Sequence, residues 1–179
     1  MKNFFMCLLL WVLSVSVLFA QTKEPASMFA RDFLPVWQRA QAYTLEVAEA
    51  MPEEQYGFSG AEDVMNFGEQ MVHITGNLYG LCSRFIVEEK SPYQKPSAKA
   101  LTKEEIIQQL QEGFAYVSTA LMRMSDEDIQ ARAPRFWAKD PTAKSVIFLL
   151  MRDHMTHHRG HCILFLRMNG IKPPSYRGW

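Results

Sequence analysis

The chain has 179 residues, of which 48% are hydrophobic and 21% are charged, and its formal net charge at pH 7 is zero. This length and hydrophobic content suffice for one ordinary domain with a sizeable core, which excludes a largely disordered protein. The balanced charge lacks the strongly basic surface with which proteins bind DNA or RNA, so we expect no nucleic-acid partner.

The first twenty residues differ from the rest of the chain. Lys2 precedes an almost wholly apolar stretch from Phe4 to Ala20, which is the pattern of a secretory signal peptide with a small residue at the cleavage point. The alternative is an uncleaved leader that anchors the protein in the membrane, but the stretch is short for a full span. We therefore predict a signal peptide over residues 1–20, a periplasmic or secreted mature protein, and no stable membrane partner after cleavage.

Cleavage at this point removes Cys7 and leaves Cys82 and Cys162. Two cysteines in an exported protein could form a disulfide. On helices, however, Cys82 would lie about half a helical circumference away from His73, whereas Cys162 would share the stripe of His158. If those two histidines meet in the core, the sulfurs do not, so we predict that both cysteines are small buried apolar residues.

Four long segments have the apolar periodicity of amphipathic helices, and we expect no strand, because no stretch shows a useful length of alternating polarity. The four segments run over residues 28–51, 64–87, 102–124 and 142–168. A capping-box signature of Thr102 and Glu105 opens the third segment, while Pro52 and Gly170 end the first and the fourth. The pattern predicts an all-α fold, a four-helix bundle over residues 28–174.

The segment between the third and fourth helices reads as a connection. Ser125 and Asp128 form another helix-start signature, which predicts a short helical turn. Pro134 and Pro141 bracket an expected loop that carries Phe136 and Trp137.

Four of the five histidines fall within eight residues, His154-Met-Thr-His-His158-Arg-Gly-His161, and the fifth is His73. His154 and His158 are four positions apart and share one helix face, whereas His73 lies where the apolar stripe of the second helix meets a polar edge. If His73 reaches the same point, three imidazoles form a metal site with open coordination positions, which indicates chemistry rather than a structural role. The alternative is a set of hydrogen-bonded boundary histidines, but the spacing and the third histidine favour the metal.

Other polar residues near these positions carry weaker signals. Gln70 and Asn77 share the helical row of His73 and could support the site, although surface positions are favoured. Glu69 and Asp153 could act as acid or base groups, although acidic residues on helix flanks are usually solvated. Gly160, inside the fourth helix, indicates the close approach of another helix, because glycine there costs about 1 kcal/mol relative to alanine.

Three segments resemble the DinB-like (DinB/YfiT) family of metal-binding four-helix bundles. They are MPEEQYGF at residues 51–58, NFGEQMVHI at 66–74, and the C-terminal stretch from His154 to Pro174, which contains HMTHHRG and LRMNGIKPP. The last segment is the most specific, and the likeness spans essentially the whole mature chain. Family members often carry glutamine where this chain has His161.

The resemblance implies that His73, His154 and His158 are the ligands of a divalent metal ion, zinc or nickel, with iron or manganese as alternatives, and that the protein forms a homodimer. Characterised relatives include thiol-dependent transferases and isomerases. We therefore predict a metal-dependent enzyme of the thiol S-transferase or hydrolase type, in which the ion lowers the pKa of a water or thiol. Its substrate would be a small molecule, with a low-molecular-weight thiol as one candidate.

Two alternatives to an enzyme stay open. Cytosolic thiols are scarce outside the cell, and no general acid or base stands out beside the histidines, which favours a non-catalytic exported bundle that binds a metal or another ligand. A purely structural bundle would instead satisfy its histidines by hydrogen bonds.

Overall fold

The computed structural model describes residues 24–135 and 138–178. The signal peptide expected over residues 1–20 lies outside this range, as do Phe136 and Trp137. None of the helices in the described ranges has the length and apolar content that crossing a membrane requires.

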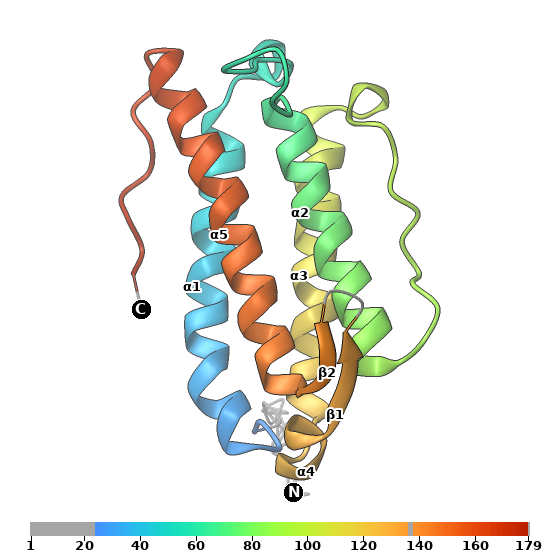
Figure 1. Ribbon diagram of the computed structural model, residues 1–179. Coiled ribbons are helices and arrows are strands. Elements are labelled where there is room, and N and C mark those ends of the chain that lie inside the picture. Colours follow the sequence, from blue (N-terminus) through green and yellow to red (C-terminus); the bar gives the residue numbers. More distant parts are fainter. Residues whose placement is uncertain (1–23, 136–137, 179) are drawn as a thin grey trace, which may run out of the picture.

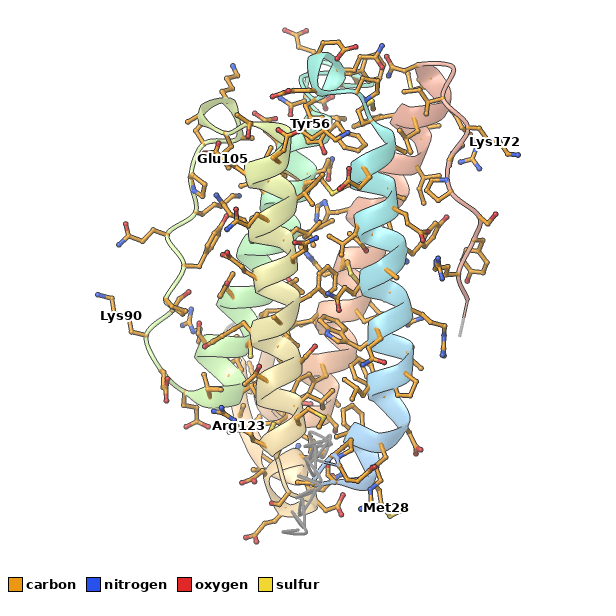
Figure 2. All side chains as sticks on the ribbon, turned by 180° about the vertical axis from the view of Figure 1, so that it is seen from behind. Met28, Tyr56, Lys90, Glu105, Arg123 and Lys172 are labelled. Atoms are coloured by element: carbon orange, nitrogen blue, oxygen red, sulfur yellow. The ribbon has the colours of Figure 1, made fainter. Side chains whose placement is uncertain are left out.

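Four long helices lie side by side and form the bundle, which confirms the predominantly helical fold (Figure 1). They are α1 (Met28–Ala50), α2 (Phe67–Leu81), α3 (Lys103–Arg123) and α5 (Lys144–Met168). Shorter helical segments connect or extend them: η1 (Glu53–Gln55), the π-helix η2 (Cys82–Val87), η3 (Ala98–Ala100) and α4 (Asp126–Gln130). In the view from behind, Tyr56 and Glu105 lie at one end of the bundle and Met28 and Arg123 at the other (Figure 2).

Capping boxes fix where α2 and α3 begin. Thr102 and Glu105 form the box predicted for α3. A second box opens α2, where Asn66 Oδ1 accepts from Glu69 N at 2.8 Å and Glu69 Oε2 accepts from Asn66 N at 3.0 Å. Helix α2 therefore begins at Phe67, three residues later than the predicted Val64. Since both oxygens of this exchange serve the helix end, Glu69 has a structural role.

The core runs along the bundle axis and is rich in aromatic and aliphatic side chains. Trp37 of α1 packs on Phe114 of α3 with ring centroids 5.2 Å apart, and Phe33 of α1 contacts Phe148 of α5 at 6.2 Å. Such fully buried side chains each contribute about 1.5–3 kcal/mol by leaving water. The largest are Trp37, Phe67, Phe114, Phe148, Met51, Met71, Ile74, Leu78, Leu110, Leu121, Ile129 and Ile147.

The two cysteines that follow the predicted leader are free and buried. The prediction that they do not form a disulfide is confirmed. Burial in apolar surroundings raises the pKa of the Cys82 thiol to about 12 and also raises the pKa of Cys162. Neither is therefore a thiolate near neutral pH, which suits packing rather than nucleophilic chemistry.

A two-stranded antiparallel hairpin occupies the segment that was predicted to be a loop. Its strands are β1 (Arg132–Arg135) and β2 (Ala138–Ala143), with Arg132 opposite Ala143 and an irregular register after Ala133. The expectation of a chain without strands is therefore wrong at this end of the bundle. The strands are short and each contains a proline, which edge strands and bulges tolerate, so the sequence shows no alternating pattern.

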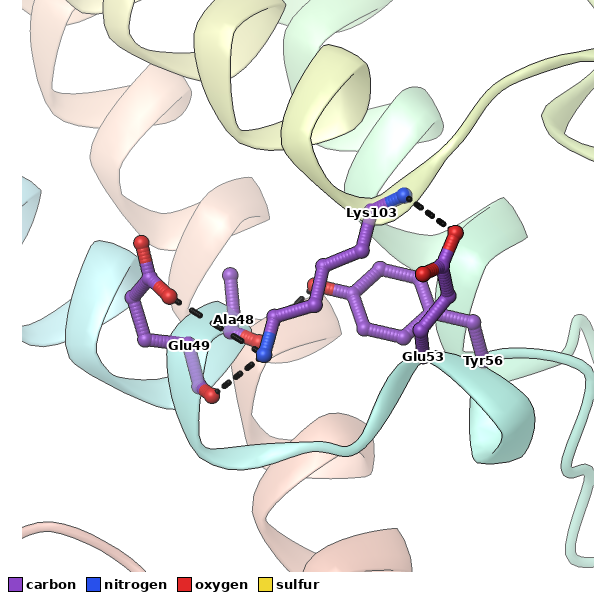
Figure 3. A network of polar contacts seen from close by, with 5 residues as sticks. All are labelled: Ala48, Glu49, Glu53, Tyr56 and Lys103. Atoms are coloured by element: carbon purple, nitrogen blue, oxygen red, sulfur yellow. Dashed lines mark hydrogen bonds and ion pairs between the residues drawn. The ribbon is translucent and has the colours of Figure 1, made fainter.

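The turn after α1 is tied to the bundle by a polar network (Figure 3). The buried Tyr56 hydroxyl donates to Ala48 O at 2.8 Å, which joins the turn to the last turn of α1. Lys103 at the start of α3 donates from Nζ to Glu49 O at 2.8 Å, and its backbone N–H donates to Glu53 Oε1 at 3.5 Å. The bonds to Ala48 O and Glu49 O satisfy carbonyls at the end of α1 that have no partner within the helix.

Candidate metal centre

Helices α2 and α5 bring His73, His154 and His158 together, although His73 is 81 residues away from the nearer partner. The Nε2 atoms of His73 and His154 are 3.3 Å apart, and those of His154 and His158 are 3.2 Å apart. Each of the three residues offers one ligand atom within 4.8 Å of the others. The i, i+4 spacing on α5 and the facing position on α2 thus converge as the sequence predicted.

This geometry fits a transition-metal ion. Zn²⁺ binds imidazole nitrogen at about 2.0–2.1 Å, so two ligands of a tetrahedral ion lie about 3.3–3.4 Å apart. The two Nε2–Nε2 distances, 3.3 and 3.2 Å, are close to that value. Three imidazoles leave at least one position open, which is typical of a catalytic rather than a structural site.

Gln70 orients the imidazole of His158. His158 Nδ1 lies 2.6 Å from Gln70 Oε1, and because the amide oxygen can only accept, Nδ1 carries the proton. The lone pair is then on Nε2, the atom that faces His154. The Gln70 amide nitrogen in turn donates to Met65 O at 3.2 Å. Gln70 is therefore buried and bound to a candidate ligand, and the prediction of a surface position for it is wrong.

The Nδ1 atoms of the other two candidate ligands, His73 and His154, have weaker hydrogen bonding than Nδ1 of His158. Lys95 Nζ lies 3.5 Å from His73 Nδ1, at the limit of a hydrogen bond. His154 Nδ1 is buried and has no hydrogen-bond partner among the described residues. A ligand histidine usually donates its second N–H to a protein group or to water, so His158 has the most complete support of the three.

Burial keeps these imidazoles uncharged near neutral pH, the form that binds metal. Burial lowers the pKa of His158 to about 3, with smaller contributions from the neighbouring imidazoles. Burial also lowers the pKa of His73, with Lys95 and His154 adding to the effect, and the pKa of His154, with His157 adding to it.

His157 and His161 lie outside the three-histidine group. His157 is exposed, and together with His158 and His161 it forms a second group whose nitrogens lie within 4.8 Å of one another. His161 Nδ1 is 3.3 Å from the amide nitrogen of Gln70 and accepts from it. His161 is thus connected to His158 through Gln70.

Of the remaining polar candidates, Asn77 is partly buried on the same helix as His73, whereas Asp153 lies at the surface. Asn77 lies one turn after His73 on α2, and its Oδ1 is buried without a partner among the described residues. Asp153 is exposed and forms an ion pair with Arg152 at 3.6 Å. It therefore lacks the buried position of a general base.

On α5, Gly160 differs from the prediction. A Cβ placed on Gly160 would meet no atom within 4 Å, so the predicted close approach of another helix is wrong. The neighbouring Arg159 is buried, and its guanidinium donates to Ala40 O at 3.2 Å and Thr44 Oγ1 at 3.1 Å. It also covers the ring of Tyr43 at 4.7 Å. No local sequence pattern indicates this contact, because it depends on the docking of α5 against α1.

The fold and the histidine cluster together define a four-helix bundle with a candidate metal centre between two of its helices. Residues 37–162 match the DinB superfamily, and the chain belongs to this superfamily, which is associated with metal binding. The resemblance found in the sequence is thereby confirmed.

Solved structures support the same fold. A DinB-like protein from Bacillus cereus ATCC 10987 is 21% identical to the chain, with a TM-score of 0.64 over 81% of this chain and 95% of that one. A DinB-like protein from Bacillus subtilis is 16% identical, with a TM-score of 0.66 over 81% and 96% of the two chains. No curated protein matches the sequence.

Proposed function

We propose that this protein is a metal-dependent enzyme of the thiol S-transferase or hydrolase type, with a divalent ion held by His73, His154 and His158. Zinc and nickel suit three neutral imidazoles best, and iron or manganese are alternatives. A bound ion would act as a Lewis acid and lower the pKa of a water or thiol in its open position. The protein's own residues provide three imidazole nitrogens that converge on one point and a Gln70 side chain that fixes the tautomer of His158.

The convergence of three Nε2 atoms is the observation that carries this proposal. Two of their distances, 3.3 and 3.2 Å, are those of ligands around one ion. Hydrogen bonds alone would explain the cluster less well, because three neutral imidazoles that point one nitrogen at a common centre offer few protons for the contacts between them.

A non-catalytic bundle that binds a metal or another ligand is the second candidate. Neither histidine group in the described residues includes an aspartate or a glutamate, so neither group contains a carboxylate that could act as a general base.

We also propose that the mature chain is exported and that it assembles into a homodimer. Each of these two proposals requires its own direct test.

Metal analysis tests the site first. The mature chain, made without a histidine tag, is analysed by plasma mass spectrometry beside a His154→Ala/His158→Ala variant and a His157→Ala control. We expect about one divalent ion per chain in the parent and the control, and none in the double variant. If the parent bound no metal even after reconstitution, the proposal would be wrong.

Thermal unfolding then separates a metal centre from a structural histidine cluster. An ion that binds only the folded protein raises the melting temperature, so EDTA should lower it in the parent and not in the double variant. Metal that is bound without any turnover in hydrolase and thiol-transfer assays would favour the non-catalytic bundle.

A further inference from the structure

A pocket of about 450 Å³ is lined in part by His73, whereas neither His154 nor His158 lines it. This volume is within the range of about 300–1,000 Å³ that is usual for small-molecule sites. The lining residues of the pocket come from the second half of α2, the π-helix η2 and the connection before α3. This connection runs back along the bundle toward α3 (Figure 1). The pocket walls are formed by His73, Gly76, Asn77, Gly80, Leu81, Arg84, Phe85, Ser91, Tyr93 and Lys95.

One stripe of α2 and η2 forms the floor of this pocket. Asn77 follows His73 by one turn, Gly80 follows by two, and Arg84 by three, so the four residues share a helix face. Gly80 leaves the floor open, because a Cβ there would meet no atom within 4 Å. Gly76, beside this stripe, allows the connection to pack closely, since its Cβ would lie 3.3 Å from Lys95 Cδ.

The charged side chains of the pocket wall are both cations, Arg84 and Lys95, and none of the described acidic residues lines it. Lys95 forms no ion pair within residues 24–135 and 138–178, where its polar contact is with His73 Nδ1 at 3.5 Å. Arg84 lies over the ring of Phe85 at 5.4 Å and also faces a neighbouring hollow that Glu88 lines. Lys95 is therefore the clearer anion-binding group.

Lys95 Nζ lies 3.5 Å from His73 Nδ1, and a hydrogen bond between these atoms would compete with a metal on His73. Lys95 can only donate, so in such a bond His73 Nδ1 accepts and the imidazole proton is on Nε2. A metal ligand needs the opposite tautomer, with the lone pair on Nε2 and the proton on Nδ1. On this reasoning, which rests on the proposed function, Lys95 must turn from His73 toward the pocket when the centre is loaded.

The rest of the wall suits an apolar body. Leu81 and Phe85 contribute carbon surface, and Tyr93 is held in place because it stacks on Tyr79 at 4.8 Å and donates to Gln109 Oε1 at 2.9 Å. Asn77 also lines the pocket, and its Oδ1 atom is buried without a partner among the described residues.

We infer that this pocket binds a small organic carboxylate with an aromatic or apolar body, its carboxylate on Lys95 and Arg84 and its body on Phe85 and Tyr93. Such a ligand lies directly beside the proposed metal centre. The substrate of that centre would then be an organic acid rather than a neutral or cationic molecule.

Calorimetric titration with 2-naphthoate and its neutral counterpart 2-naphthamide tests this inference on the mature chain, both metal-loaded and treated with EDTA. We expect 2-naphthoate to bind at least about 5-fold more tightly than the amide in both states, because only the acid offers charge-assisted hydrogen bonds. Lys95→Met should remove most of this preference, while Lys99→Met, at an exposed position outside the pocket, should keep it.

A second pair of variants tests the location. Gly80→Leu should fill the pocket and abolish binding of both molecules, and Gly160→Leu, at a helical glycine with equally open space on α5, should leave binding unchanged. Circular dichroism of each variant checks the fold. Equal binding of acid and amide, no binding of either at millimolar concentration, or binding insensitive to Lys95→Met and Gly80→Leu would overturn the inference. Binding of 2-naphthoate in the metal-loaded state alone that is also insensitive to Lys95→Met would place the carboxylate on the ion and overturn it too. An empty metal centre with intact binding in EDTA would refute the proposed function and leave the pocket standing.

Discussion

The side-chain amide of Gln70 joins two imidazoles of α5: its oxygen accepts from His158 Nδ1 at 2.6 Å, and its nitrogen donates to His161 Nδ1 at 3.3 Å. One buried residue of α2 thus fixes the tautomer of a candidate ligand and connects it to a histidine outside the three-histidine group. These two contacts explain why position 70, one turn before His73, is a glutamine.

Replacing Gln70 should weaken metal binding while leaving all three candidate ligands in place. We expect Gln70→Ala to lower the affinity for zinc about 10–100-fold, which is the usual loss when the group that orients a ligand histidine is removed. Competition with a chromophoric chelator measures this affinity. Gln108→Ala, which removes an exposed glutamine of α3 that bonds to Glu112, is the control and should bind as the parent does. An unchanged affinity in Gln70→Ala would mean that Gln70 only fills space.

Binding of one metal ion per chain should not require His161. It belongs to the group with His157 and His158, not to the group with His73, and its contact with the candidate centre runs through Gln70. We expect His161→Gln to retain one ion per dialysed chain with an affinity within about 10-fold of the parent, since a glutamine oxygen can also accept from Gln70. His73→Ala, in the same elemental analysis, should lose the ion. Loss of metal in both variants would place His161 among the ligands.

The sequence was enough for the main architecture because each long helix has its own apolar stripe. The Thr102 and Glu105 capping box predicted the start of α3 to the residue. Asn66 and Glu69 carry the same kind of signature, with asparagine in place of threonine, and it could have placed the start of α2. The i, i+4 pair of His154 and His158 likewise follows from local spacing alone.

Features that depend on the docking of one helix against another could not be predicted in this way. Gln70 looks like a surface residue until α5 brings His158 to it, and Arg159 gives no sign that Ala40 and Thr44 will accept its hydrogen bonds. The hairpin was missed for a different reason. Its strands are stabilised by pairing with each other, and short segments that contain prolines have no periodic pattern of their own.

The metal-free protein should lose stability as the pH is lowered from about 6.5 toward 3. Burial lowers the pKa of His158 to about 3 and also lowers the pKa of His73 and His154, whereas a histidine in the unfolded chain has a pKa of about 6.5. In this window the unfolded chain therefore binds more protons than the folded one. The free energy of unfolding then falls as the pH falls, by up to about 1.4 kcal/mol per pH unit for each histidine.

Urea unfolding in EDTA at several pH values between 7 and 4 measures this dependence. His158→Gln should make it shallower, because one of the groups that protonates on unfolding is gone. His157→Gln, at the exposed neighbouring position, serves as the control and should keep the slope of the parent. A free energy of unfolding that did not change across this range would contradict burial of neutral imidazoles.

One glycine within α5 and one that packs against it should change the free energy of unfolding in opposite directions when each is replaced by alanine. Gly160 lies within α5 and a Cβ there meets nothing within 4 Å, so Gly160→Ala should raise the free energy of unfolding by about 1 kcal/mol, the difference in helix propensity. Gly60, in the connection before α2, faces the other outcome, because its Cβ would lie 2.9 Å from Cε1 of the buried Phe165. Gly60→Ala should therefore destabilise the protein, since overpacking of this size costs about 1–3 kcal/mol. Urea unfolding of both variants beside the parent measures the two signs, and a destabilised Gly160→Ala would show that α5 has a neighbour on that face after all.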